Sequence, residues 1–191
     1  MKTALLASYE KDESLHRLGR LLIDNGWQLW GSAGTARFLS ENHIPCRDIA
    51  SIVGPPILGH RVVTLARKVY AALLANTKED FEELDRLGVS SINLVYVTLY
   101  PLEQTIADPK ATPEDVLEHT DIGGPTLLRA AAKGQRLALS DPSQIDLIDP
   151  WIKNGSPDSE RGPLVARLAA AAERCVADYV NASATYWESR L

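Results

Sequence analysis

An acid and an amine flank a short apolar helix in the stretch DIGGPTLLRAAAK, residues 121–133. If both faced one bound molecule, Asp121 could act as a base and Lys133 could give and take protons. The local pattern alone favours a structural explanation, because Asp121 suits the amino end of a helix and Lys133 complements the dipole at its carboxyl end. A helix of about 12 residues spans roughly 18 Å, so local spacing leaves both interpretations open.

A second candidate is the segment WGSAGTAR, residues 30–37, between a predicted strand and the helix that follows it. Small residues let the backbone approach an anion, and the amino end of a helix directs unpaired N–H groups towards it. Ser32 and Thr35 could add hydroxyl donors. The segment matches neither the Walker pattern nor the dinucleotide fingerprint, so a plain strand-to-helix turn is the alternative to a phosphate cradle.

Two further segments carry polar groups. The sequence TLYP, residues 98–101, ends the most strand-like run, where open α/β sheets usually bind ligands, and Tyr100 could donate a hydrogen bond there. A tyrosine at a strand end is also a common rim residue. The segment GHRVVTLARK, residues 59–68, offers anion donors, with ordinary surface charge as the alternative; these donors are Arg61, Thr64, Arg67 and Lys68.

Composition limits the classes of function. With 191 residues, 45% of them hydrophobic, the chain can bury a core, and we expect one domain over residues 1–191. The net charge of -5 and the scattered basic residues do not favour a nucleic-acid surface. The two cysteines and the histidines at positions 16, 43, 60 and 119 lack ligand spacing, so we predict no metal. Without an apolar run long enough for a secretory signal or a membrane span, we expect a cytoplasmic protein.

Strands and helices alternate along the chain, which predicts a mainly parallel sheet with helices on both faces. The run SINLVYVTLY is continuous in apolar residues and is therefore predicted to be central. A helix interrupted at Pro150 and a loop-rich segment at 154–163 precede a closing helix over about 160–191. The predicted strands are TALLAS, WQLWGS, SINLVYVTLY and RLALS; the predicted helices are ESLHRLGRLLIDNG, TARFLSENH, TKEDFEELDRLG, residues 125–133, PSQIDLIDPWIKNG and the closing helix.

Four motifs, SAGTA, RVVTL, TLYPLEQTIA and DIGGPTLLRAAAK, resemble in order and spacing the IMP cyclohydrolase domain of the bifunctional purine-synthesis enzyme. That domain has the methylglyoxal-synthase-like fold, a Rossmann-like three-layer α/β arrangement. The resemblance covers nearly the whole chain, while the family's formyltransferase domain has no counterpart here. It implies a free-standing cyclohydrolase that needs no cofactor, acts on a phosphoribosyl nucleotide in purine biosynthesis, and could form a homodimer.

The family's reaction is a cyclodehydration, in which a carboxamide nitrogen attacks a formyl carbon and water is lost. Such a reaction needs a base, a donor for the formyl oxygen and a proton for the leaving hydroxyl. By resemblance, Asp121 is the base, Lys133 the proton donor and acceptor, and Tyr100 an oxyanion or water-positioning group. The resemblance also places residues around the nucleotide: Lys11, Ser32, Ala33, Gly34, Thr35, Arg61 and Thr64 mostly near its phosphate, and Thr98, Gly123 and Gly124 near its base.

The chain also departs from the family's pattern. Val63 stands where the family has a lysine that contacts the reacting formyl group, and Lys68 is the candidate to replace it. Thr98 replaces an asparagine, and Tyr9 with Glu10 replaces a Ser-Asp pair. The phosphate side matches better than the base side, which favours a changed ring or an altered mechanism.

Three functions follow as hypotheses. The first is a cyclohydrolase acting on the ordinary purine intermediate or on a modified analogue from a specialised pathway. The second is a catalytically impaired purine-nucleotide-binding or regulatory module, suggested by the loss of the lysine at Val63. The third, a methylglyoxal-synthase-like sugar-phosphate lyase, fits the motifs less well. The enzymatic hypothesis depends on Asp121 and Lys133 lining one cleft opposite a phosphate pocket.

Overall fold

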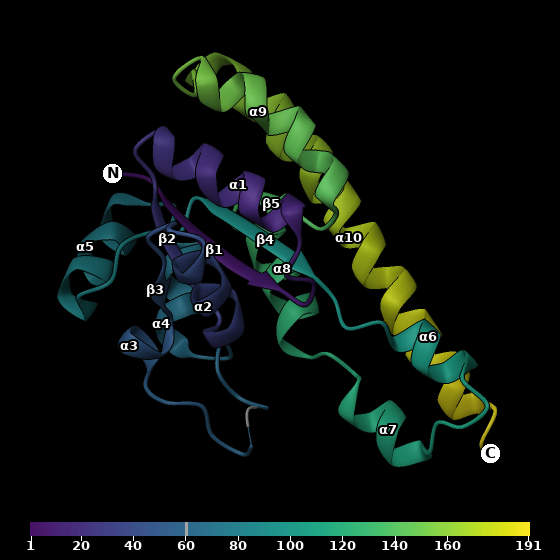
Figure 1. Cartoon of the computed structure of the whole chain (residues 1–191). Coiled ribbons are helices and arrows are strands. Elements are labelled where there is room, and N and C mark those ends of the chain that lie inside the picture. Colours follow the sequence, from purple (N-terminus) through teal and green to yellow (C-terminus); the bar gives the residue numbers. More distant parts are fainter. Residues whose placement is uncertain (60) are drawn as a thin grey trace.

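A five-stranded parallel sheet forms the centre of the computed structural model, which describes residues 1–59 and 61–191 (Figure 1). The strand order is β3-β2-β1-β4-β5, and neighbouring strands pair in parallel. This arrangement confirms the predicted α/β class. The strands are β1 (Thr3–Ser8), β2 (Gln28–Gly31), β3 (Arg47–Asp48), β4 (Leu94–Thr98) and β5 (Leu137–Leu139).

Both faces of the sheet are buried, which explains the nearly continuous apolar runs of its strands. Side chains alternate along β1, so that Ala4 and Leu6 enter one core while Leu5 enters the other. The strand predicted to be central, β4, lies inside the sheet between β1 and β5, and β1 itself occupies the middle position. The strongest apolar run therefore marked an interior strand without identifying the central one.

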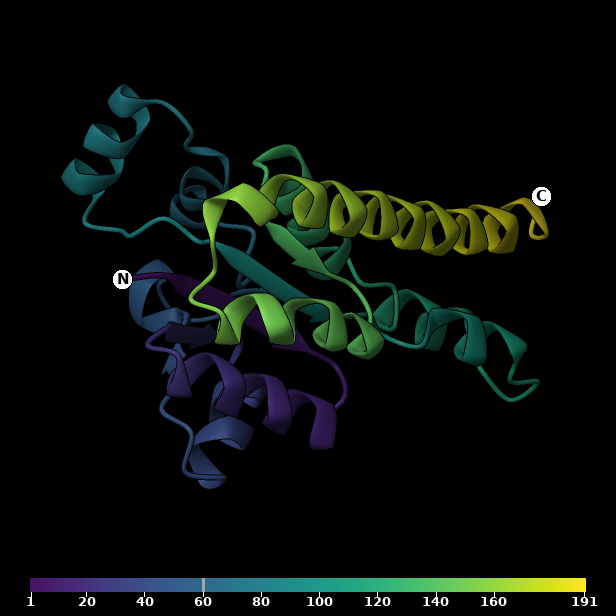
Figure 2. The same ribbon diagram turned by 90° about the horizontal axis from the view of Figure 1, so that it is seen from above.

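Helices cover the two faces of the sheet (Figure 2). One core is formed with α1 (Glu13–Asp24), α2 (Ala33–Glu41) and α9 (Ile145–Lys153). The opposite core is formed with α4 (Arg67–Leu74), α5 (Lys78–Leu87) and α8 (Gly123–Lys133). The short helix α3 (Ala50–Val53) adds Ile52 and Val53 to the second core.

The final helix, α10 (Asp158–Glu188), runs along the side of the sheet and packs against β5 and α8. Two predictions near it were wrong. Pro150 does not interrupt α9, and α10 begins inside the segment predicted to be loop-rich, with Pro163 within the helix. A proline removes one backbone hydrogen bond, but apolar side chains on both sides of Pro150 and after Pro163 are buried: Ile148, Trp151, Ile152, Val165 and Leu168. Their packing outweighs the missing bond.

Two helices that the sequence analysis did not predict lie beside α10. They are α6 (Leu102–Ala107) and α7 (Pro113–Glu118), and a small third cluster formed by Leu102, Val116 and Tyr186 joins them to α10. Thr112 begins α7 with a capping box, in which its hydroxyl accepts from the Asp115 N–H and the Asp115 carboxylate accepts from the Thr112 N–H. By packing α7 against α10, this cluster also fixes the start of the segment that leads from α7 to α8.

Within the described residues, no helix is both long enough and apolar enough to span a bilayer, and no group of three or more histidine, cysteine or acidic side chains could hold a metal ion. The two cysteines are free and partly buried, Cys46 in one core and Cys175 in the other. Burial raises the pKa of the Cys46 thiol to about 12. Both thiols therefore behave as packing groups.

Candidate active site

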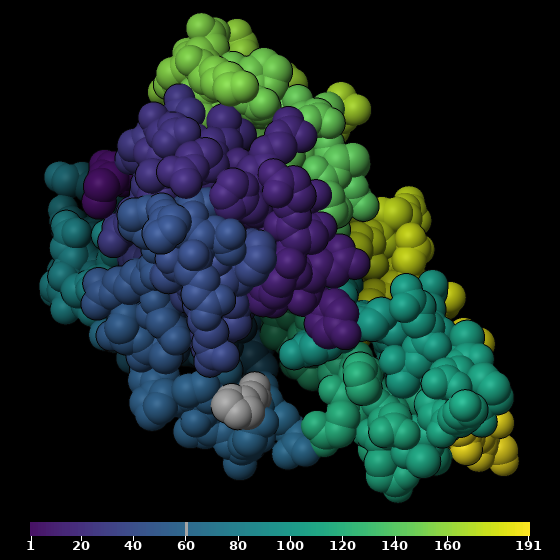
Figure 3. All heavy atoms as spheres, viewed as in Figure 1, coloured from purple at the N-terminus to yellow at the C-terminus, as the bar shows by residue number. Residues whose placement is uncertain are grey.

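A hollow of about 640 Å³ opens at the carboxyl ends of β1 and β4. The strand order reverses between these two strands, and ligands bind at such switch points in open α/β sheets. The space-filling view shows the hollow between the blue segment that precedes α4 and the teal region of α7 (Figure 3). Residues predicted for the site that line it are Ser32, Arg61, Thr64, Thr98, Tyr100, Asp121, Gly123 and Gly124.

The ends of β1 and β4 are joined by a hydroxyl network. Thr98 Oγ1 accepts hydrogen bonds from the N–H groups of Tyr9 at 2.8 Å and Glu10 at 3.2 Å, and it lies 2.7 Å from Ser8 Oγ. Because Ser8 Oγ donates to the Glu10 carbonyl, Thr98 is the donor to Ser8. The Thr98 hydroxyl is thus engaged in shaping the loop after β1, although its residue lines the hollow.

The amino end of α2 lies beside this network. Among the described residues no side chain caps the helix, and Ser32 Oγ instead donates to Thr35 Oγ1 at 3.0 Å. The buried Thr35 hydroxyl accepts from the Ser8 N–H at 3.1 Å, which fixes α2 against β1. Uncapped N–H groups and exposed small residues, Ala33 and Gly34, leave this helix end open to an anion.

Lys11 is held next to the same helix end. Its Nζ donates to the carbonyls of Ser8 and Tyr9, the latter at 3.0 Å, and a Cβ on Gly34 would lie 3.4 Å from Lys11 Cε. Burial lowers the pKa of Lys11. The structure therefore brings together the predicted phosphate cradle, with Ser32 in the wall of the hollow and the other cradle residues beside it.

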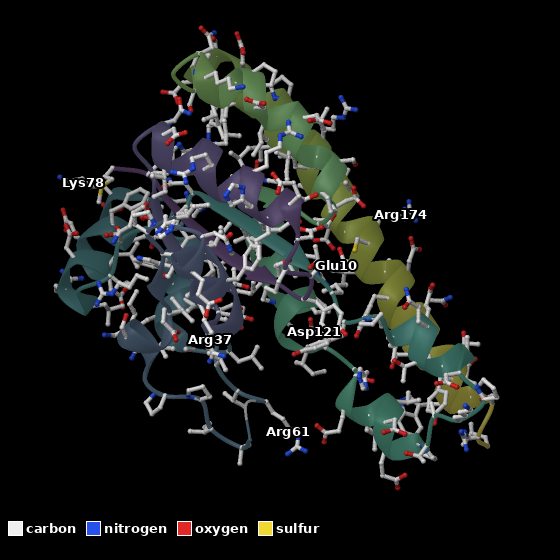
Figure 4. The ribbon with its side chains drawn as sticks, in the orientation of Figure 1. Glu10, Arg37, Arg61, Lys78, Asp121 and Arg174 are labelled. Carbon is white, nitrogen blue, oxygen red and sulfur yellow. The ribbon has the colours of Figure 1, made fainter. Side chains whose placement is uncertain are left out.

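A loop with an antiparallel bridge between Ile57 and Val62 forms another wall. The exposed Arg61 forms an ion pair with Glu118 of α7, so the two sides of the mouth are joined by a charged contact. The side-chain view shows Arg61 on this loop, with Asp121 deeper in the molecule (Figure 4). His60, one of the histidines considered for metal binding, lies outside the described residues.

Asp121 is both a helix cap and a wall of the hollow. Its Oδ1 accepts from the Gly124 N–H at 2.9 Å, so the carboxylate caps α8 while it faces the hollow. Burial raises the pKa of Asp121, and hydrogen bonds from the Gly124 and Gly123 N–H groups oppose this shift. The capping and chemical interpretations of this residue are therefore compatible.

The paired glycines allow the close approach that this cap requires. A Cβ on Gly124 would lie 2.4 Å from Asp121 Oδ2 and 2.6 Å from Leu99 Cδ2, so any larger residue would displace the carboxylate, the leucine or the helix. A Cβ on Gly123 would lie 3.1 Å from Oγ1 of the buried Thr64. The glycines thus let α8 begin directly against β4 and the loop that carries Arg61.

Tyr100 stands at the rim, with its ring 4.9 Å from that of Tyr9 in an edge-to-face arrangement. Its pKa is raised, mainly by burial and then by the negative charge of Asp121. Tyr100 therefore keeps its proton near neutral pH and can donate a hydrogen bond into the hollow.

Within the single chain, the structure does not bring Asp121 and Lys133 together in one cleft. Lys133 is exposed at the carboxyl end of α8 and is not among the residues that line the hollow. The helix is continuous from Gly123 to Lys133, which separates its ends by roughly 15 Å. Lys68, in the first turn of α4, also lies outside the lining, whereas Val63 supplies apolar surface to the hollow.

Sequence reasoning missed several groups in this wall. Glu118 and Thr120 line the hollow just before Asp121, and Tyr9 lines it after β1. Their closeness to predicted site residues was a usable signal for all three. The arrangement as a whole combines an anion site at α2, a buried carboxylate, a tyrosine donor and an apolar surface formed by Val63, Leu65 and Ile122.

Comparisons with known proteins give a consistent result. The sequence model of the family described as the MGS-like domain matches residues 14–126. The chain is 38% identical over 190 residues to the bifunctional purine biosynthesis protein PurH of Natranaerobius thermophilus, an alignment that covers 97% of this chain and 36% of that protein. The PurH protein of a Cyanothece species is 42% identical over 133 residues, which cover 68% of this chain and 26% of that protein.

Among solved structures, the chain is similar to the crystal structure of ForH. The TM-score is 0.84 and the identity 30%, over 97% of this chain and 98% of the ForH chain. The chain spans about a third of the length of the curated relatives that it matches.

Proposed function

We propose, on the premise that the chain belongs to the MGS-like domain family, that it closes a ring on a formamido-carboxamide ribonucleotide as an IMP cyclohydrolase-type enzyme. The observation that carries this proposal is the hollow in which Asp121 and Tyr100 face a helix end suited to phosphate. Similarity to proteins named for purine biosynthesis supports it.

In this proposal the phosphate binds at the amino end of α2. Backbone N–H groups of the uncapped helix donate to it, the Ser32 hydroxyl can turn from Thr35 Oγ1 to donate to it as well, and Lys11 contributes a positive charge nearby. Arg61 is the other cation at the mouth. Its pairing with Glu118 means that a phosphate has to compete with a carboxylate for this guanidinium.

The chemistry is an intramolecular addition followed by loss of water. The carboxamide nitrogen forms a bond to the formyl carbon, and the formyl oxygen becomes a hydroxyl. That oxygen then leaves as water, with one proton from the carboxamide nitrogen and one from the formamido nitrogen. Holding the two groups in contact in a walled hollow lowers the barrier by removing the entropy cost of their encounter.

Asp121 and Tyr100 carry the proton transfers in this scheme. The raised pKa of Asp121 makes its carboxylate a stronger base than an exposed aspartate, and the acid it becomes can protonate the departing hydroxyl. Tyr100, which keeps its own proton, donates a hydrogen bond to the formyl oxygen as negative charge develops there. A single carboxyl group that acts first as base and then as acid replaces the role expected of Lys133.

The ring that fits this hollow is either that of the ordinary purine intermediate or that of an analogue. Val63 presents an apolar side chain where the related family has a cation, and Tyr9 narrows the rim with an aromatic ring. Both changes lie on the side where the base would bind, and they favour an analogue with a less polar reacting edge.

A binding module is the second candidate, favoured by the same Val63 and by the position of Lys133 outside the hollow. Such a module would retain the anion site and lack turnover. Its occupant would be a purine nucleoside monophosphate.

One assay separates these candidates. Purified protein is incubated with the formamido ribonucleotide and with ring-modified analogues, and ring closure is followed by ultraviolet absorbance. Catalysed closure of any of them supports the enzyme. Saturable binding of purine monophosphates without closure supports the binding module, and the absence of both binding and closure contradicts both candidates.

A further inference from the structure

A tyrosine from the last helix holds the backbone on which the site carboxylate stands. The hydroxyl of Tyr179, on α10, accepts a hydrogen bond from the Asp121 N–H at 2.7 Å and donates one to the His119 carbonyl at 3.1 Å. One side-chain oxygen thus bridges the two backbone groups on either side of Thr120, the His119 carbonyl and the Asp121 N–H. The nearest regular elements along the chain, α7 and α8, end at Glu118 and begin at Gly123.

This contact completes the restraints on Asp121. At its side chain, Oδ1 accepts from the Gly124 N–H at 2.9 Å, and at its backbone the N–H donates to Tyr179. The first restraint lies within the α8 turn, whereas the second comes from a residue 58 positions away in the sequence. Among the described residues, Tyr179 supplies the only hydrogen bonds to this short segment that come from outside α7 and α8.

The same segment orients the tyrosine donor of the site. The ring of His119 meets the ring of Tyr100 edge to face, with centroids 6.5 Å apart, and Tyr179 fixes the His119 carbonyl. The α10 hydroxyl therefore restrains the backbone of Asp121 and that of His119, whose ring contacts Tyr100, without lining the hollow itself.

We infer that Tyr179 is a positioning residue for the ring closure, and that α10 controls the placement of Asp121 through this one hydroxyl. This inference rests on the proposed function. It predicts an effect on the chemical step and little effect on nucleotide binding, because the hydrogen bonds of Tyr179 go to the Asp121 segment and not to the α2 end or Lys11. A displacement of a catalytic group by even about 1 Å lowers rates substantially.

The chain contains a matched control on the same helix. Tyr186 is buried in the cluster with Leu102 and Val116, and its hydroxyl has no hydrogen-bond partner among the described residues. Tyr179→Phe and Tyr186→Phe each remove one oxygen from α10, but only the first removes a contact with the Asp121 segment.

The experiment measures ring-closure kinetics for wild type and both variants, at a temperature at which circular dichroism shows all three to be folded, together with amide exchange at Asp121. We expect Tyr179→Phe to lower kcat about tenfold, to leave KM within about twofold, and to speed exchange of the Asp121 amide. We expect Tyr186→Phe to match wild type in all three measurements.

Each other outcome overturns a distinct claim. An unchanged kcat in Tyr179→Phe, with an active wild type, refutes the positioning role and leaves the proposed function in place. Equal losses in both tyrosine variants also refute it, because the effect would then be one of general packing. An inactive wild type refutes the proposed function, and the catalytic role of Tyr179 with it.

Discussion

The two sides of the hollow, which the proposed function assigns to the phosphate and to the base of a nucleotide, are built in different ways. The phosphate side uses one strand-to-helix turn, in which Ser32 and Thr35 lie within a few residues of each other and Lys11 joins them from the loop after β1. The base side gathers Tyr9, Val63, Tyr100 and Asp121 from four separate segments. A site made of backbone N–H groups tolerates side-chain changes, whereas a site made of dispersed side chains can change its chemistry through single substitutions.

The largest expected effect lies on the base side, at Asp121. Asp121→Asn keeps the size of the side chain and an oxygen that can cap α8, but it removes the base, so we expect ring closure to fall by at least about 100-fold. Binding of a purine monophosphate, measured by calorimetry, should change by less than about threefold, because the anion site is intact. Comparable losses of binding and turnover would contradict the separation of the two sides.

The pH dependence of ring closure should report the same carboxyl group. The pKa of Asp121 is raised above its ordinary value near 3.9, so the active carboxylate is lost at a higher pH than for an exposed aspartate. Below this pKa, kcat/KM should fall about tenfold per pH unit. The same raised pKa has the opposite effect on the free energy of unfolding. It favours the folded state at low pH, and this contribution is lost as the pH rises and Asp121 ionises. An acid limb at the ordinary carboxyl pKa would contradict burial as the cause.

The next effect concerns the glycine that permits the cap. Gly124→Ala would place a methyl group against the carboxylate of Asp121 and the side chain of Leu99, so we expect a loss of about 1–3 kcal/mol in the free energy of unfolding and a loss of activity. Gly162→Ala is the matched control, because a methyl group at this position in α10 would meet no described atom within 4 Å. The control should be neutral or slightly stabilising, as judged by urea titration.

A smaller effect is expected at the mouth. Arg61→Ala should raise KM for the nucleotide about tenfold, since it removes one charge from an anion site that retains α2 and Lys11. Glu118→Gln frees Arg61 from its partner and should lower KM about twofold to threefold. Initial rates over a range of nucleotide concentrations check both. A Glu118→Gln variant with a raised KM would show that the ion pair organises the site and does not compete with phosphate.

The smallest effect should be at Lys133. Because this side chain is exposed at the far end of α8, Lys133→Ala should leave kcat and KM within about twofold of wild type. Loss of activity in this variant, with the fold intact by circular dichroism, would mean that the lysine reaches a reacting group by an arrangement other than that of the single chain.

Local patterns predicted the parts of the fold that depend on local physics. The apolar runs marked four strands, and Gly88, the last residue of the predicted helix TKEDFEELDRLG, ends α5 with a φ of 64°. Pro150 and Pro163 indicated a helix break and a loop, but both lie inside continuous helices. At both positions, packing against distant residues stabilises the helix. Helices α6 and α7 escaped prediction because they are short and are held by contacts with α10.

The site shows the same division between local and long-range information. Asp121 and the cradle at Ser32 could be chosen as site residues from their motifs and from the resemblance. In both cases the residues that shape the local backbone lie within the same short motif. Lys133 was assigned to the site because it belongs to the same motif as Asp121. The motif does not show that a continuous helix places the two residues at opposite ends, with Lys133 outside the hollow of the single chain. The link from Tyr179 to Asp121 spans 58 positions and has no local sign in either segment.

The long closing helix bears on how the chain can be shortened. The matched family segment ends at residue 126, well before α10 begins, so it includes Asp121 but not the helix that steadies it. A fragment trimmed to that boundary would also lose β5 and most of α8, including the α8 side chains that pack in the second core. The smallest independently working unit of this protein should therefore reach at least to the last turns of its final helix.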